Sequence, residues 1–255
     1  MIALSIATAR RNTDYRTELS LWQTTLDRLP NARAHRNYAT VLRRAGRQDD
    51  EVIFHLREGV RLGHPEGRYA VGFELYEQGR RDDAVTELRQ FIRENPKDVE
   101  VPAAYVLIGR AFADQRRHED AIAAFEAALR VDPGYLDAHG GLADALLAAQ
   151  RFDAAIVEYE IVIRQRPGLA NAWNNLGVAR VQAGREDGVR EAFARAVELD
   201  PQNGPARRAL AAILLHDGEV TAAAAHAEAA VRLLPGDPAA RELVELARRA
   251  QSRQR

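Results

Sequence analysis

Apolar and polar residues follow one another along most of the chain with the spacing of amphipathic α-helices, and these helices come in pairs. In the stretch 172–201, the apolar positions predict a first helix over about 172–183. Gly184 follows it, at the place of a left-handed residue that ends a helix. A second helix fills the remainder and stops before Pro201, which cannot continue it. The pattern therefore predicts an all-α chain.

The same pair of helices returns every 34 residues. A proline closes each of four successive periods: Pro133, Pro167, Pro201 and Pro235. The preceding proline, Pro96, stands 37 residues before Pro133, which is one period with three residues inserted. Such a repeat in a helical chain is typical of a stacked array, because one pair cannot bury both of its faces alone.

Three columns of similar residues accompany these prolines. Small residues stand 24 positions before each proline: Gly72, Gly109, Ala143, Gly177 and Ala211. Mostly small residues also stand 12 positions before: Ala84, Ala121, Ala155, Val189 and Ala223. Large residues dominate the column eight positions before: Leu88, Phe125, Tyr159, Phe193 and Ala227. A helical glycine costs about 1 kcal/mol against alanine. We therefore expect the two small columns to face each other across a close helix contact, with the large column filling the gap between successive pairs.

The ends of the helices carry their own signals. Gly79 and Gly218 share the place of Gly184 and should end first helices in the same way. Another column stands near the start of each second helix: Asp82, Glu119, Asp153, Asp187 and Thr221. We expect its members to accept hydrogen bonds from unpaired N–H groups, and its acids to complement the helix dipole.

These residues resemble the tetratricopeptide repeat (TPR) family. The matching residues of one repeat are Trp173, Leu176, Gly177, Phe193, Ala196 and Pro201. Those of another repeat are Tyr105, Gly109, Phe112, Ala121, Phe125, Ala128 and Pro133. Val189 departs from the usual small alanine and Arg180 from the usual tyrosine. The resemblance covers about 32–235 and implies a right-handed α-solenoid of stacked antiparallel helix pairs.

The period divides the chain into six repeat units with a segment at each end. We place the units at 32–64, 65–101, 102–135, 136–169, 170–203 and 204–237. The segment 1–31 is expected to be a lead helix or half repeat, and 238–255 a capping helix with a basic tail.

The first 40 residues carry a second resemblance, to the junction between membrane and TPR array in bacterial polytopic glycosyltransferase-like proteins. It implies that 1–9 is the end of a membrane-spanning helix and that the chain is a membrane-tethered soluble domain. The alternative is a frayed or hydrophobic first helix turn that packs on the array of a cytoplasmic protein. Residues 13–29 predict an amphipathic helix with Leu19, Trp22 and Leu26 on one face.

Composition and motifs argue against catalysis. The chain has no cysteine, which excludes disulfides, thiolate zinc sites and cysteine nucleophiles. Its seven histidines show no metal-ligand spacing, and neither a phosphate-binding loop nor a dinucleotide fingerprint is present. We therefore predict no enzyme, no metal and no cofactor. The 36 basic and 37 acidic residues nearly cancel, so no general field attracts nucleic acid.

Candidate binding residues project from the first helices, away from the packing columns. In the TPR family this concave face binds extended or helical peptides, and the resemblance implies the same here. The candidates of the first three units are Arg36, Asn37, Arg43, Tyr69, Phe73, Tyr76 and Arg110. Those of the next two are Asp144, Asn171, Asn174 and Asn175. The three aromatics share one helical face, although a rotated register after the link 64–67 would turn Tyr69 inward.

Two functions remain open at this point. The leading interpretation is a non-catalytic scaffold that binds a protein segment with acidic residues and an apolar or aromatic anchor, because its candidate surface combines arginines with aromatics. The alternative is a C-terminal accessory domain of a bacterial membrane glycosyltransferase-like protein. The pair Gly140–Gly141 could let a ligand approach the backbone, or could be a tolerated irregularity of a first helical turn.

Overall fold

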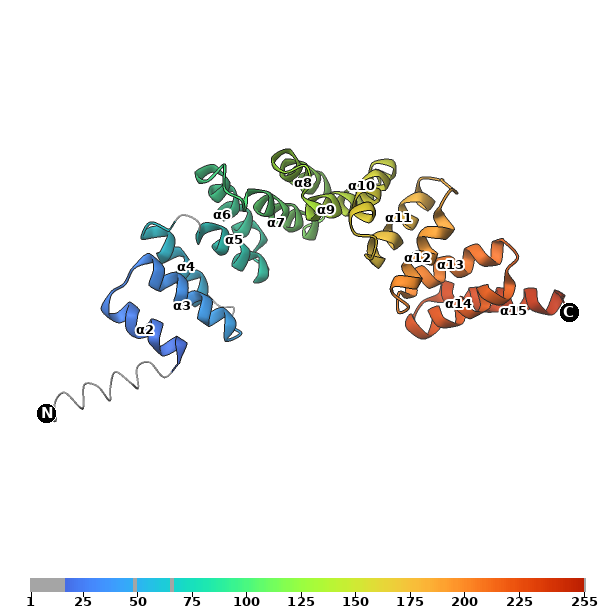
Figure 1. The fold of residues 1–255 in the computed structure, drawn as a ribbon. Coiled ribbons are helices and arrows are strands. Elements are labelled where there is room, and N and C mark those ends of the chain that lie inside the picture. Colours follow the sequence, from blue (N-terminus) through green and yellow to red (C-terminus); the bar gives the residue numbers. More distant parts are fainter. Residues whose placement is uncertain (1–16, 48–49, 65–66, 255) are drawn as a thin grey trace. The chain divides into compact units, whose positions relative to one another are not determined.

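The protein, seen in a computed structural model, is helical throughout the part that the structure describes, residues 17–47, 50–64 and 67–254. Fourteen α-helices lie in these ranges, and no strand occurs among them (Figure 1). This confirms the all-α solenoid of helix pairs expected from the sequence. The chain divides into two compact units, one ending at Tyr135 and the other beginning at Leu136.

The first unit contains a single helix followed by three pairs. The helices are α2 (Glu18–Arg28), α3 (Ala32–Arg44), α4 (Asp50–Arg61), α5 (Gly67–Glu77), α6 (Arg81–Glu94), α7 (Val101–Asp114) and α8 (His118–Val131). Each first helix packs on its second, α3 on α4, α5 on α6 and α7 on α8, and each second helix packs on the next first helix.

The second unit repeats this arrangement. Its helices are α9 (Leu136–Ala148), α10 (Phe152–Gln165), α11 (Ala170–Gln182), α12 (Val189–Leu199), α13 (Gly204–His216), α14 (Val220–Leu233) and α15 (Pro238–Gln254). The last helix packs on α14 and α13 and buries Ala240, Val244 and Ala247. The exact boundaries of the six repeat units stay a prediction.

The glycines of the first small column pack against the large residue of their own pair, which corrects our expectation that the large column fills the gap between successive pairs. A Cβ atom on Gly109 would lie 2.8 Å from the ring of Phe125, and one on Gly72 would lie 2.5 Å from Leu88. Gly177 stands in the same relation to Phe193. The large residue therefore lies over the glycine inside one pair. The glycine is needed because a side chain would take the space of the ring.

All six first helices that belong to pairs end in one hydrogen-bonded motif. The residue two positions beyond the last helical residue has a positive φ in every case: Gly46, Gly79, Arg116, Gln150, Gly184 and Gly218. The following N–H donates back to the third-last helical carbonyl, as from Arg80 to Leu75 at 2.9 Å. Arg116 and Gln150 adopt this left-handed conformation without being glycine, at φ of 59° and 60°.

The acidic column does not cap the second helices, so that expectation was wrong. The N-cap residues are Arg80, Arg117, Arg151, Gly188 and Glu219, and none makes a side-chain capping hydrogen bond. The acids of α6, α8 and α10 lie in the first turn, where they complement the dipole. Some also join neighbouring pairs: Asp82 accepts from Gln115 at 2.9 Å, and Asp153 pairs with Arg185 at 2.7 Å.

The N-terminal helix α2 packs on the first pair. Thr17 and Ser20 form a reciprocal capping box at its start. Leu19, Trp22 and Leu26 pack against the core cluster that α3, α4, α5 and α6 form together, as their spacing predicted. The proposed membrane segment 1–9 lies outside the described residues. Among the helices that are described, none is long and apolar enough to cross a bilayer.

Candidate peptide-binding surfaces

Helices α3 and α5 meet at one contact between an arginine and an aromatic ring, Arg43 and Phe73. We call the candidate residues of these two helices the α3/α5 surface: Arg36, Asn37, Arg43, Tyr69, Phe73 and Tyr76. The guanidinium carbon of Arg43 lies 5.4 Å from the centre of the Phe73 ring, within reach of a cation–π contact. Its Nε atom is 3.3 Å from Oε2 of Glu74, whose residue is only 1% exposed. Arg43 therefore bridges a half-buried ring and a buried carboxylate.

The other members of this surface are held to different degrees. A guanidinium nitrogen of Arg36 lies 2.8 Å from Nε2 of His64, while the Arg36 residue remains exposed. Asn37 is half-buried on the same helix. Arg110, the candidate from α7, is exposed. Burial raises the pKa of the Tyr69 hydroxyl, and the charge of Arg110 lowers it by a smaller amount.

The three aromatics of α5 are all half-buried, but their surroundings differ. Tyr69 packs on the buried ring of Phe91 with ring centres 5.7 Å apart, and burial, then the charge of Glu100, raises the pKa of its hydroxyl to about 12. Tyr76 packs on the core cluster and lies under Arg81, 4.1 Å from ring centre to guanidinium carbon. The Phe73 ring differs from both tyrosines, because among the described residues its cation–π contact is with Arg43 of the preceding first helix.

Arg81 holds Tyr76 in place. Its Nε atom donates to Oδ2 of Asp114 at 2.7 Å, and another guanidinium nitrogen donates to the carbonyl of Tyr76. Burial raises the pKa of the Tyr76 hydroxyl, and the nearby Asp114 carboxylate raises it further. The Tyr76 ring thus forms part of a contact between α5, α6 and α7, whereas the Phe73 ring contacts Arg43 of α3.

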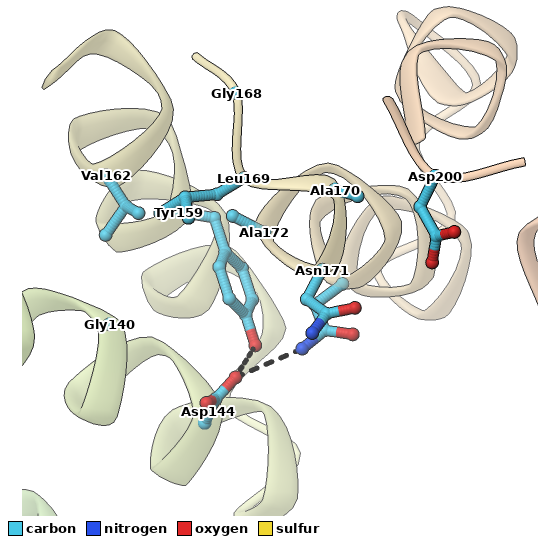
Figure 2. Close-up of a pocket in the computed structure, with 11 residues that line it drawn as sticks. Gly140, Asp144, Tyr159, Val162, Gly168, Leu169, Ala170, Asn171, Ala172 and Asp200 are labelled. Carbon is cyan, nitrogen blue, oxygen red and sulfur yellow. Dashed lines mark hydrogen bonds between the residues drawn. The ribbon is translucent and has the colours of Figure 1, made fainter. Parts of the chain in front are cut away.

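In the second unit, α9, α10 and α11 surround a hollow of about 320 Å³, which we call the α9/α11 hollow. Gly140 and Asp144 of α9 line it, together with Asn171 and Asn175 of α11. Asp200, just after α12, lines it as well. Figure 2 shows the carboxylates of Asp144 and Asp200 on either side of Asn171.

Two hydrogen bonds fix Asp144. The hydroxyl of Tyr159, a residue 1% exposed, donates to its Oδ1 at 2.6 Å, and Nδ2 of Asn175 donates to the same oxygen at 3.1 Å (Figure 2). Burial and the Asp144 charge raise the pKa of Tyr159 far above its usual range, so the hydroxyl keeps its proton. Asn174 does not line the hollow; its Nδ2 donates to Asn175 at 3.0 Å.

The model of the tetratricopeptide repeat family matches this chain at residues 72–135, 106–170, 141–204 and 190–238. These matches cover more than half of the chain. It belongs to the tetratricopeptide repeat family.

Solved TPR structures resemble this TPR array. Residues 41 to the end of MamA from Desulfovibrio magneticus RS-1 are 21% identical over 68% of this chain and 97% of that one, with a TM-score of 0.61. YrrB, described as a TPR protein with an unusual peptide-binding site, is 15% identical over 72% and 95%, also at 0.61. The C-terminal part of a TPR protein from Cytophaga hutchinsonii is 13% identical over 92% and 96%, at 0.72. These identities support the fold alone. No curated protein sequence matches the chain.

Sequence reasoning missed two parts of the α9/α11 hollow. Tyr159 was assigned to the packing column, and nothing in the repeat pattern shows that its hydroxyl reaches Asp144 from α10. Asp200 precedes a repeat proline and lies outside every first helix. The available signal was the spacing of Gly140 and Asp144, four apart and therefore on one helical face.

We also examined the described ranges for side chains that could bind a metal ion. No group of three or more His, Asp or Glu side chains there is arranged to hold a metal ion.

Proposed function

We propose that this TPR protein is a non-catalytic scaffold that binds a partner protein segment on surfaces formed by its first helices. The observation that carries the proposal is Phe73, a half-buried ring on α5 beside Arg43 and outside the core cluster. Aromatic residues and arginine contribute most often to interface hot spots.

The partner segment should carry an apolar or aromatic anchor for Phe73 and acidic residues for the arginines of α3. Residues 1–64 contain 11 arginines and 7 acids, whereas the whole chain has a net charge of −1. A locally basic region on a nearly neutral protein favours an acidic peptide over nucleic acid, whose binding would depend on many phosphate contacts. Arginine also binds carboxylates through paired hydrogen bonds.

The test is selection of binding peptides from a displayed library on the full chain, followed by titration of the best peptide against variants. Phe73→Ala should weaken binding by about 1–3 kcal/mol, the range of interface hot spots, while the melting temperature changes little. Phe54→Ala is the matched control, because Phe54 is 56% exposed on α4, a second helix. Equal losses in the two variants would argue against the α3/α5 surface.

The arginines are tested separately. Arg36→Ala should mainly slow association and flatten its dependence on salt, because charges at the rim of an interface steer the encounter more than they hold the complex. The membrane tether and the glycosyltransferase-like context remain predictions, since they depend on residues 1–9.

A further inference from the structure

Gly140 is a helical glycine without a packing reason. A Cβ atom at Gly109 or Gly177 would collide with an aromatic ring, whereas one at Gly140 would meet nothing within 4 Å. Glycine inside a helix costs about 1 kcal/mol relative to alanine. Gly140 lines the α9/α11 hollow, and a larger side chain at this position would extend into the open space of the hollow. Gly168, in the turn between α10 and α11, also lines the hollow and also faces open space.

The charged groups of the hollow have one sign. Two carboxylates line it, Asp144 and Asp200, and no Lys, Arg or His is among its lining residues. Both hydrogen bonds to Asp144 end on Oδ1, and no donor to its Oδ2 is recorded among the described residues. Oδ1 of Asp200 accepts the backbone N–H of Gln202 at 2.9 Å. A concave site lined by fixed negative charge attracts a cation.

The remaining walls suit the stem of a long side chain. Val162 and Leu169 line the hollow beside the Tyr159 ring and give it apolar walls. Lysine and arginine lay their methylene groups along apolar surface while the charged head reaches polar partners. A volume of about 320 Å³ equals roughly ten liquid waters, which is enough for one such side chain.

Asn171 and Asn175 supply the contacts that a main chain requires. Both project from α11 into the hollow. The Asn175 amide already donates to Asp144 and accepts from Asn174, so it keeps one N–H and one lone pair for a ligand. The Asn171 amide can offer both its donors and its acceptor to the N–H and C=O groups of an extended peptide.

A small metal ion would leave the apolar walls of Val162 and Leu169 uncovered. In the described ranges no group of three or more His, Asp or Glu side chains is arranged to hold one, which favours a long side chain as the occupant.

We propose that the α9/α11 hollow binds a lysine or arginine side chain of an extended partner segment, with Asp144 and Asp200 facing its charge. The inference rests on the proposed scaffold function and adds a second, cation-selective contact to it. This site lies in the second unit and uses none of the residues of the α3/α5 surface.

The probe is the peptide acetyl-Ala-Ala-Arg-Ala-Ala-amide, titrated into the full chain while NMR follows the side-chain amides of Asn171 and Asn175 and the backbone of Gly140. The peptide should shift these signals in a saturable way. A peptide with citrulline, a neutral isostere of arginine, should bind at least about fivefold more weakly because it lacks the charge. Ethylguanidinium, a cation without a main chain, should also bind more weakly than the arginine peptide.

Two variants separate charge from space. Asp144→Asn keeps an acceptor oxygen for Tyr159 and Asn175 but removes the charge, so affinity for the arginine peptide should fall to that of the citrulline peptide. Gly140→Leu should fill the hollow and abolish the shifts without unfolding the helix. The controls are Asp153→Asn, an exposed acid of α10, and Gly236→Leu, a glycine in a turn that also faces open space. Both should bind as the unchanged protein does.

Several results would overturn this site. The first two are a citrulline peptide or ethylguanidinium that binds as tightly as the arginine peptide. The third is an unchanged affinity for the arginine peptide in Asp144→Asn, and the fourth is a titration without saturable shifts. None of them would affect the α3/α5 surface, whose test depends on Phe73→Ala and a different peptide. Conversely, if Phe73→Ala did not weaken peptide binding at the α3/α5 surface, the NMR result for the α9/α11 hollow would still hold.

Discussion

The ring of Phe193 lies so close to Gly177 that a Cβ atom on the glycine would be 2.8 Å from the Cζ atom of the ring. Phe193 is itself buried. The first and second helices of this pair can therefore pack around a large aromatic only because residue 177 has no side chain. The same relation joins Gly109 to Phe125.

Gly177→Ala should destabilise the protein despite the better helix propensity of alanine. Overpacking a well-filled contact costs about 1–3 kcal/mol, more than the roughly 1 kcal/mol gained from propensity. Urea unfolding followed by circular dichroism measures the difference. Gly140→Ala is the control and should stabilise by about 0.5–1 kcal/mol, because its Cβ atom meets nothing. Similar effects at both positions would contradict this packing.

Arg116→Gly and Gln150→Gly should each stabilise the protein. Both residues hold a left-handed backbone at the end of a first helix, a conformation that costs a residue with a Cβ atom about 1 kcal/mol. The greater freedom of glycine in the unfolded chain offsets part of the gain. Gly184→Ala, at φ of 68°, should destabilise by a similar amount. Thermal and urea melts of the three variants test the sign, and stabilisation by Gly184→Ala would refute the assigned helix end.

Arg43→Ala should destabilise the first unit by about 1–3 kcal/mol, because the carboxylate of Glu74 is buried and would lose its ion pair with Arg43. The neighbouring Arg44 is the control. It lies 3.6 Å from Glu18 with both side chains exposed, and exposed pairs contribute about 0–1 kcal/mol. Equal losses would show that Glu74 does not depend on Arg43. This stability effect must be subtracted before any loss of peptide binding in Arg43→Ala is interpreted.

Acidification should destabilise the first unit through His35 and His55, whose Nδ1 atoms are 2.9 Å apart. Burial lowers the pKa of His35. The charge of Glu58 raises this pKa by a smaller amount, and the charge of Arg61 lowers it. Burial and then the charge of His35 lower the pKa of His55. Since both folded pKa values lie below the unfolded value of about 6.5, the unfolded state binds more protons. Stability is therefore complete above about pH 6.5 and falls as the pH drops through the folded pKa values.

Urea unfolding at pH 7.5 and pH 5.5 measures this loss. His55→Gln should reduce the difference between the two pH values, because only one imidazole of the pair can then gain a proton. His226 of the second unit, whose pKa is lowered by burial, should retain its share of the pH dependence. An unchanged difference in His55→Gln would exclude the pair as its source.

Part of the candidate surface could be predicted from the sequence. Spacing alone placed Tyr69, Phe73 and Tyr76 on one face of a helix, and all three are half-buried on α5. Spacing could not separate them, because their burial depends on Phe91 and Arg81 from α6. Those contacts are set by the packing of one helix on the next, which a repeat pattern does not encode.

The sequence by itself determined the periodic features of this protein: the helix pairs, the proline and glycine positions, and membership of a repeat family. These features follow from local backbone preferences and from the need of each pair to bury its faces. The tertiary structure alone decided which groups meet across helices. It placed Phe193 over Gly177, aimed the Tyr159 hydroxyl at Asp144 and left open space at Gly140. Such contacts depend on interhelical distances and side-chain rotamers. Gly177 therefore makes room for a ring, whereas Gly140, at another position of its repeat, faces open space.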